Sequence, residues 1–299
     1  MDTLYVVGGL YGNLPALDTV EAMVAAERGT PVIVFNGDFH WFDARPDHFA
    51  EVNRRVALHI ATRGNVEAEL ARVIDAGAGC GCAYPETVDA DTVERSNQIH
   101  ARLRMCIEEL PHVRELFSAL PLTLVAAIGA LRIGIVHGDA ESLAGWGFAR
   151  AALDSPDSRA WLEAVRAASV IDVYASSHTC LPVLRDFQLE AGRLTIINNG
   201  AAGMPNFRGT THGVLTRIGL HRSPHPTLYG MERDGVCIDA LAVPYDQRRW
   251  LRDFTGTWPS GSPAHDSYFR RIVDGPQFLR REAFARLGAA AVESRGCLT

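Results

Sequence analysis

The stretch Val34-Phe35-Asn36-Gly37-Asp38 carries an apolar run directly into a glycine and a carboxylate. A short run of this kind that ends in turn residues is typical of a buried strand. In α/β sheets ligands gather beyond the carboxyl ends of the strands, so Asp38 lies where a ligand would be held. The stretch therefore predicts an α/β fold with a site at the end of one strand.

Three more strand-like runs end in the same way. A carboxamide, Asn65, ends Ile60 to Asn65, and imidazoles end two further runs at His137 and His178. One carboxylate oxygen, one amide oxygen and two imidazole nitrogens suit Mn²⁺, Zn²⁺ or Fe²⁺ better than Mg²⁺ or Ca²⁺, which prefer oxygen ligands. We predict that one divalent transition metal is held by Asp38, Asn65, His137 and His178.

Each of these residues has a simpler interpretation when it is taken alone. Asn65 could cap the helix that begins at Val66, and Asp38 could accept hydrogen bonds from loop N–H groups. Each histidine could be a hydrogen-bonded core residue. The shared position at strand ends, beside glycines, favours the metal site for the four together.

The rest of the chain alternates short apolar runs with amphipathic stretches, as buried strands and covering helices do. Several runs in the second half follow one another without helices, which indicates two mixed sheets, the later one partly antiparallel, packed face to face. We predict a four-layer α/β/β/α sandwich. Strands are predicted at 3–8, 31–36, 58–62, 122–127, 131–137, 171–175, 182–187, 193–198, 212–218 and 236–243, and helices at 14–28, 46–56, 66–75, 91–109, 111–119 and 157–168.

The domain organisation follows from changes in composition. Residues 1–245 form the predicted sandwich, and 246–299, with arginine and aromatic clusters, are interpreted as a mainly helical extension. Residues 76–120 begin rich in glycine and continue as helix, so we interpret them as an excursion that could cap a site. There are no internal repeats.

Composition and charge exclude some functions. The 35 acidic residues outnumber the 29 basic ones, so a broad basic surface for nucleic acid or an anionic membrane is absent. No apolar run approaches the ~20 residues that span a bilayer, and Met1-Asp2-Thr3 leads into a strand-like run rather than a secretion signal. A cytoplasmic location is expected.

Six cysteines are too few and too irregularly spaced for a disulfide framework. Only Cys80 and Cys82 are close neighbours, and their spacing is not that of a zinc finger. Ordinary reduced thiols in a glycine-rich turn are favoured over metal or redox use.

The sequence resembles the calcineurin-like metallophosphoesterases, in particular their small bacterial phosphodiesterases. The family pattern Asp-x-His-Gly-Asn, Gly-Asp, Gly-Asn-His-Asp/Glu, His-Gly and Gly-His-x-His is matched in order from Leu4 to Asp246. A later Asn-Pro-Gly-Ser-x-Gly-x-Pro turn is similar to residues 198–205. The matching segments are Gly9-Leu10-Tyr11-Gly12-Asn13, Gly37-Asp38, Gly64-Asn65-Val66-Glu67, His137-Gly138 and Ser177-His178-Thr179-Cys180.

This resemblance implies two metals that share Asp38. One metal would also be held by Asn65, His137 and His178, and all of these are present. The other would need side chains at positions that are altered here. Those positions are Gly9, Tyr11 and Cys180, and the histidine that would protonate the leaving group is replaced by Val66.

Loss of one metal is the simplest account of these changes. Tyr11 as phenolate and Cys180 as thiolate could still bind a metal, although packing or hydrogen bonding is favoured for both. One divalent ion could still polarise a phosphoryl oxygen. Without a general acid, the enzyme would favour phosphoanhydrides and aryl esters, whose leaving groups need no proton.

Replacements for the lost acid could lie two residues after the ligands, at His40 and Asp139. Trp41 could then form a stacking surface, and Arg63 or Arg208 could contact phosphate. His40 and Trp41 could equally pack a loop, and Asp139 could orient a ligand histidine.

Three functions remain open. The first is a metal-dependent hydrolase of a small phosphorylated substrate. The second is a non-catalytic descendant of the fold that binds a nucleotide or a protein partner. The third is a different metal chemistry that uses Cys180, with Cys80 and Cys82 if the excursion folds over the site.

Overall fold

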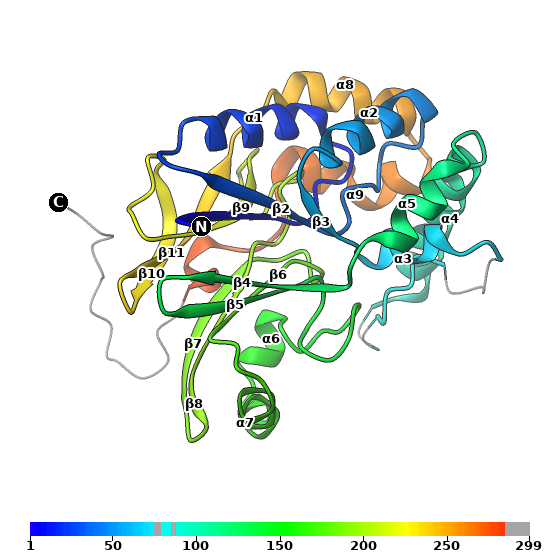
Figure 1. Ribbon diagram of the computed structural model, residues 1–299. Coiled ribbons are helices and arrows are strands. Elements are labelled where there is room, and N and C mark those ends of the chain that lie inside the picture. The colour runs from blue at the N-terminus through cyan, green and yellow to red at the C-terminus, as the bar shows by residue number, and fades with distance from the viewer. Residues whose placement is uncertain (75–78, 85, 87, 285–299) are drawn as a thin grey trace.

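The computed structural model describes residues 1–74, 79–84, 86 and 88–284, and these residues contain two mixed sheets (Figure 1). The first sheet has the strand order β10-β11-β9-β1-β2-β3. Within it, β1, β2 and β3 are parallel, and β9 runs antiparallel to β1. Its strands are β1 (Thr3–Val7), β2 (Pro31–Asn36), β3 (Ile60–Thr62), β9 (Gly213–Gly219), β10 (Thr227–Arg233) and β11 (Val236–Val243).

The second sheet has the order β4-β5-β6-β8-β7. Its centre is parallel, because β6 pairs in parallel with both β5 and β8, and its outer strands are antiparallel. Its strands are β4 (Thr123–Ile128), β5 (Leu131–Val136), β6 (Val173–Ser176), β7 (Val183–Leu189) and β8 (Gly192–Asn198).

Helices cover both outer faces, which confirms the predicted four-layer sandwich (Figure 1). The helices α1 (Leu14–Ala25), α2 (Pro46–Val56) and α8 (Gln247–Thr257) lie over the first sheet, and α6 (Arg150–Leu153) and α7 (Ser158–Ala168) over the second. At one end, α3 packs on α5 and α4 packs on α9. These helices are α3 (Asn65–Ala71), α4 (Ala90–Ile107), α5 (His112–Ala119) and α9 (Pro263–Asp274), and the short α10 (Arg280–Ala283) contacts β7.

Alternation along β1 explains how one strand serves two cores. Leu4 and Val6 belong to the apolar cluster between the sheets, whereas Tyr5 and Val7 belong to the cluster under the helices. Successive side chains of a strand point to opposite faces, so a strand buried on both faces is apolar throughout. All five residues of β1 are buried.

The C-terminal residues that the structure describes pack into this same core. Trp250, Phe254 and Trp258 are buried, and the indole N–H of Trp258 donates to the carbonyl oxygen of Phe42 at 2.7 Å. The boundary between 245 and 246 stays a prediction. Among the described residues, no helix is both long enough and apolar enough to cross a membrane.

Two elements were not predicted. Strand β10 contains Gly230, which has no side chain and so interrupts the alternation of apolar and polar residues. A glycine is needed there because a Cβ would lie 2.5 Å from Asp239 Oδ1. Helix α6 is a single turn and leaves no periodic signal. The predicted helix 66–75 ends earlier, at Ala71. Residue 75, and residues 76–78, 85 and 87 of the predicted excursion, lie outside the described residues.

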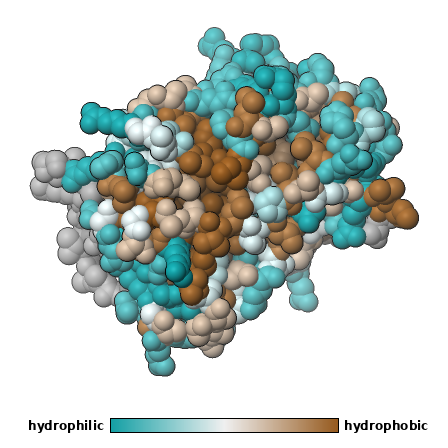
Figure 2. Space-filling model, in the orientation of Figure 1, coloured by the Kyte–Doolittle hydropathy of each residue, from teal (hydrophilic) through white to brown (hydrophobic). Residues whose placement is uncertain are grey.

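One face of the molecule shows apolar side chains at its surface, and Figure 2 shows a band of hydrophobic residues running across that view. Among the exposed large hydrophobic residues, Leu58, Ile60, Leu122 and Val125 lie in or next to the edge strands β3 and β4. The two edges meet where the backbone N–H of Arg63 donates to the carbonyl oxygen of Pro121.

Candidate metal centre

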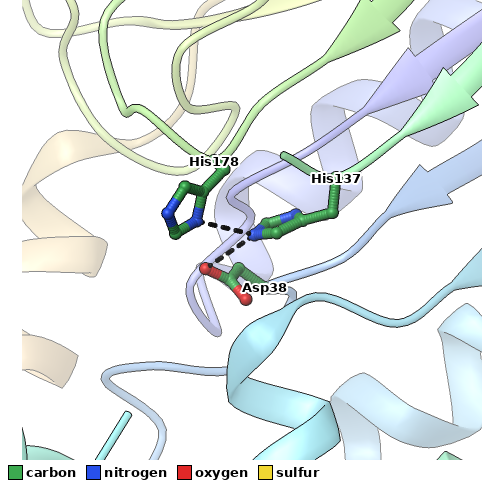
Figure 3. Close-up of side chains that lie close together, drawn as sticks. All are labelled: Asp38, His137 and His178. Carbon is green, nitrogen blue, oxygen red and sulfur yellow. Dashed lines mark hydrogen bonds and ion pairs between the residues drawn. The ribbon is translucent and has the colours of Figure 1, made fainter. Parts of the chain in front are cut away.

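The four predicted ligands meet at the carboxyl ends of four strands. Figure 3 shows three of them, Asp38, His137 and His178, pointing toward one another. Asp38 follows β2, Asn65 starts α3 after β3, and the two histidines follow β5 and β6. Around His137 Nε2 lie Asn65 Oδ1 at 3.0 Å, Asp38 Oδ2 at 3.3 Å and His178 Nδ1 at 3.3 Å. All four residues are buried, so the sequence prediction that they converge is matched by the geometry.

The hydrogen bonds behind this cluster decide which atoms face its centre. His137 Nδ1 lies 2.9 Å from the carbonyl oxygen of Asn36, which can only accept, so Nδ1 carries a proton and the ring, whenever it is neutral, presents the Nε2 lone pair inward. The Asn65 amide nitrogen donates outward to the carbonyl oxygen of Cys80 at 2.7 Å, so Oδ1 faces inward.

Three acceptors therefore converge without a donor of their own when His137 is neutral. A carboxylate oxygen, an amide oxygen and an imidazole lone pair repel one another unless a cation or a proton lies between them. His178 adds a second imidazole, whose Nε2 is buried and has no hydrogen-bond partner among the described residues. The donor set fits a divalent transition metal.

The pKa values of the ligands reflect their mutual proximity. Burial disfavours an imidazolium, but the Asp38 carboxylate and the Asn36 carbonyl outweigh it and raise the pKa of His137. Burial and the charge of His137 lower the pKa of His178 to about 3, so His178 is neutral and one of its two ring nitrogens carries a lone pair. Burial opposes ionisation of Asp38, yet the histidines lower its pKa overall.

Asn36 forms hydrogen bonds to both of the loops that carry His137 and His178. Its carbonyl oxygen also accepts from Ser177 Oγ at 3.0 Å, and its amide nitrogen donates to the carbonyl oxygen of Val136 at 2.8 Å. Its amide oxygen accepts from Thr62 Oγ1 at 3.1 Å. The last residue of β2 thereby links both sheets directly behind the ligands, and the sequence alone had not marked it as functional.

Glu67 is a second residue that sequence reasoning missed. It is fully buried, and its Oε2 accepts from the backbone N–H groups of Asp38 and Gly64, both at 2.8 Å. One carboxylate thus joins the loop that carries Asp38 to the loop that carries Asn65. Burial and the nearby Asp38 charge raise the pKa of Glu67 to about 7. Its position three residues after a helix cap was the available signal.

The Tyr11 side chain occupies the half of the site where the resemblance implied a second metal. Gly9 has φ +64°, and a Cβ there would lie 3.1 Å from Cζ and from the hydroxyl oxygen of Tyr11. Tyr11 therefore occupies the space into which a side chain at position 9 would project. The Tyr11 hydroxyl lies 2.9 Å from Cys180 Sγ.

Both partners of this pair are neutral. Burial raises the pKa of Tyr11 well above its usual range, and the neighbouring Cys180 adds to the effect. Burial also raises the pKa of the Cys180 thiol. The Tyr11 hydroxyl and the Cys180 thiol therefore form a hydrogen-bonded pair of neutral groups, which is the interpretation that the sequence favoured for both residues.

Helix α9 closes this half from outside. Arg271 donates to the carbonyl oxygens of Cys180 at 2.5 Å and of Pro205 at 3.3 Å. Tyr268, from the same helix, packs edge to face on Phe42 with ring centroids 5.1 Å apart. The C-terminal extension thereby covers the region where the resemblance implied a second metal.

Backbone strain is concentrated in the same loops. Asp38, Tyr11 and Cys180 have φ values of 49°, 56° and 57°, and Asp234 is the other non-glycine residue with positive φ in the described part of the chain. Such conformations cost about 1–3 kcal/mol each and persist where surrounding contacts hold them.

The remaining predicted site residues lie as follows. Both ring nitrogens of His40 are occupied, by Asp43 Oδ2 at 2.5 Å and Asn53 Oδ1 at 3.1 Å, and the ring stacks on Phe49. These are the contacts of a packed core residue, so His40 is left out of the proposed chemistry. Trp41 is also buried in the core.

Val66 cannot act as the missing acid, and the two arginines predicted to contact phosphate, Arg63 and Arg208, make no hydrogen bond to the predicted ligands in the described part of the chain. Val66 is buried, and its backbone N–H donates to Asp38 Oδ1 at 3.2 Å. Arg63 is half-buried with its Nε unpartnered among the described residues, and Arg208 is exposed. No contact joins either arginine to a predicted ligand within the described ranges.

Asp139 organises a loop rather than facing the ligands. Its oxygens accept from the backbone N–H groups of Glu141, Ser142 and Gly147 at 2.9 to 3.0 Å. That loop places Trp146 edge to face against His178, with ring centroids 5.5 Å apart. Asp139 is therefore a positioning residue, and Trp146 is a wall of the site that the sequence had not indicated.

The comparisons with known proteins place the fold. No family model matches the chain, and no curated protein matches it. A hypothetical protein of Pyrococcus horikoshii OT3 superposes with a TM-score of 0.61 at 17% identity, over 93% of this chain and 100% of the other. A metallophosphoesterase from Sphaerobacter thermophilus gives 0.55 at 17% identity, over 92% and 100%. The chain therefore has the metallophosphoesterase fold.

Proposed function

We propose that the protein is a metal-dependent hydrolase of phosphate esters or anhydrides that works with one divalent transition metal. The observation that carries this proposal is the convergence of Asp38 Oδ2, Asn65 Oδ1 and His178 Nδ1 around His137 Nε2. The shared fold with a metallophosphoesterase supports it. A small phosphorylated substrate and a cytoplasmic location belong to the proposal and rest on the sequence.

The chemistry divides between the metal and the chain. A bound divalent ion would supply Lewis acidity toward a phosphoryl oxygen and would lower the pKa of water. The chain holds the ligands in place through Asn36 and Glu67, and it places the Trp146 ring against His178.

The leaving group limits the substrate class. Val66 cannot donate a proton, and His40 is occupied within the core, so no general acid stands at the expected position. A general acid contributes about 10² to 10⁴ in rate. Phosphoanhydrides and aryl phosphate esters, whose leaving groups depart without a proton, are therefore the preferred substrates over alkyl phosphates.

A second candidate function is favoured by the filled half of the site. Tyr11 occupies the space above Gly9, and all the ligands are buried. A non-catalytic protein of this fold that binds a nucleotide or a partner protein would show the same features. Metal content separates the two, because the hydrolase requires a stoichiometric metal.

The first experiment is elemental analysis of protein purified without added metal and after loading with Mn²⁺, Zn²⁺ or Fe²⁺. One metal per chain is expected for the parent and much less for His137→Ala and His178→Ala. His221→Ala, which changes an exposed histidine, is the matched control. A parent chain that binds none of the three metals would favour the non-catalytic function.

The second experiment is a substrate panel with the loaded protein. Aryl phosphodiesters, nucleotides and dinucleoside polyphosphates are compared with alkyl phosphates, and hydrolysis of the first group is expected to be lost in His137→Ala. A metal-loaded parent that hydrolyses none of them, or that hydrolyses them equally after His137→Ala, contradicts the proposal.

A further inference from the structure

The turn that contains Cys80 and Cys82 lies directly against a predicted metal ligand. The Asn65 amide nitrogen donates to the carbonyl oxygen of Cys80 at 2.7 Å and to Cys82 Sγ at 3.2 Å. These two acceptors turn the amide so that Oδ1 faces His137. The turn therefore orients a predicted ligand that is about 15 residues away in sequence.

The geometry of the pair suits a reversible covalent link. The two cysteines are separated by Gly81, whose φ of +71° makes a tight turn. Residues two apart are at most about 7 Å from each other along the chain, within the range that a disulfide spans after a small adjustment. Cys80 is buried and Cys82 is partly exposed. Both are free thiols.

We propose that Cys80 and Cys82 form a reversible disulfide on exposure to a hydroperoxide, and that this disulfide weakens metal binding by withdrawing the Cys82 sulfur from Asn65. The effect on metal binding rests on the proposed function, because it requires a metal at Asn65. The formation of the disulfide does not rest on it.

The reaction balances without further reagents. One of the two cysteine sulfurs attacks the peroxide O–O bond, and hydrogen peroxide leaves one water and a sulfenic acid on that cysteine. The sulfur of the other cysteine then attacks the sulfenic acid sulfur, the S–OH bond breaks and a second water leaves. Two thiols are oxidised, one peroxide is reduced to two waters, and a dithiol reductant reverses the step.

The consequence for Asn65 follows from the contacts. In the disulfide, Cys82 Sγ is bonded to Cys80 Sγ, so it cannot keep its present position as an acceptor for the amide. Loss of a partner that orients a ligand typically costs 10-fold to 100-fold in metal affinity. We expect a decrease of that size for the oxidised protein.

The test uses the full chain in metal-free form and hydrogen peroxide as the probe. After alkylation of remaining thiols, mass spectrometry of the peptide that contains residues 80–82 is expected to show the loss of two hydrogens, reversed by dithiothreitol. Cys80→Ser and Cys82→Ser should abolish this change, and Cys106→Ser, which alters a buried thiol of α4, should not. A peptide that stays fully reduced while other thiols are oxidised overturns the inference.

The second measurement is the affinity for Zn²⁺ or Mn²⁺ by chelator competition before and after oxidation. Cys82→Ser keeps an acceptor beside Asn65, so its affinity should resemble that of the reduced parent and should not respond to peroxide. Equal affinities for reduced and oxidised parent chains contradict the inference. A reduced parent that binds no metal contradicts the proposed function instead, and the disulfide is still scored by mass.

Discussion

At the scale of single residues, the altered positions depend on each other. Gly9 has no side chain, and the Tyr11 ring lies where one would be. The convergence of the four candidate ligands could be predicted from sequence because each follows a strand-like apolar run. The contact between Gly9 and Tyr11 could not, since it depends on a loop conformation with positive φ at both residues.

The first prediction concerns this contact. Gly9→Ala is expected to lower the free energy of unfolding by about 1–3 kcal/mol, because it adds a Cβ at positive φ and against the Tyr11 ring. Gly209→Ala is the matched control, since Gly209 has φ +71° and nothing within 4 Å of an added Cβ. Urea unfolding measures both.

A double-mutant cycle then measures the contribution of the contact between an added Cβ at position 9 and the Tyr11 ring. Gly9→Ala should cost less in a Tyr11→Ala background than in the parent, which gives a favourable coupling between the two substitutions. Equal costs in both backgrounds would show that Tyr11 does not obstruct position 9.

The second prediction concerns Glu67. Glu67→Gln should lower the free energy of unfolding by about 2 kcal/mol, because a charged acceptor of two backbone N–H groups is replaced by an amide. Metal affinity should fall 10-fold to 100-fold, since both ligand loops lose their shared anchor. Chelator competition measures the affinity, and Glu94→Gln on the exposed face of α4 is the control. Unchanged affinity would contradict the role given to Glu67.

At the scale of elements, the strongly apolar strands and longer amphipathic helices could be predicted, and the weak ones could not. β1 is buried along its whole length and β2 along its last four residues, and their sequences are mostly apolar, without a polar residue at every second position. β10 is an edge strand with exposed and half-buried residues around Gly230, and its sequence carries little alternation. Edge strands pack on fewer neighbours, so fewer of their residues are constrained to be apolar.

The third prediction concerns the loop between β5 and α6. Asp139→Ala removes the acceptor for three backbone N–H groups, so the loop that carries Trp146 should open more often. We expect faster chymotryptic cleavage after Trp146 and a loss of about 1–2 kcal/mol in stability. Asp157→Ala, at an exposed position before α7, should change neither. Cleavage at the parent rate would show that Asp139 does not hold the loop.

At the scale of the whole molecule, the two sheets and their covering helices followed from the order of apolar runs, whereas the closure of the site by α9 did not. Arg271 and Tyr268 reach the site from a helix that is distant in sequence. Their residue types do not distinguish them from other surface arginines and tyrosines, so only the packed structure reveals them.

The fourth prediction is a pH dependence that arises far from the metal centre. Asp239 lies beside Arg217, at 3.6 Å, but burial dominates and raises its pKa from 3.8 to about 6. The folded chain therefore binds the Asp239 proton more tightly than the unfolded chain. The stability from this group is fully present below about pH 4 and is lost as pH rises through 6.

Asp239→Asn tests this sign. The free energy of unfolding of the variant relative to the parent should increase by roughly 2 kcal/mol between pH 4 and pH 7, since each pKa unit corresponds to about 1.4 kcal/mol and the range begins near the unfolded-state pKa. Denaturant unfolding across this range measures it, with the exposed Asp91→Asn as control. A difference that is independent of pH would mean that Asp239 titrates normally.

The Tyr11 ring above Gly9 also limits which substitutions the chain tolerates. An aspartate introduced at position 9 would meet the ring, and a histidine introduced at position 11 alone would stand above a residue without a ligand atom. Any engineered second metal site in this half therefore requires positions 9 and 11 to be changed together.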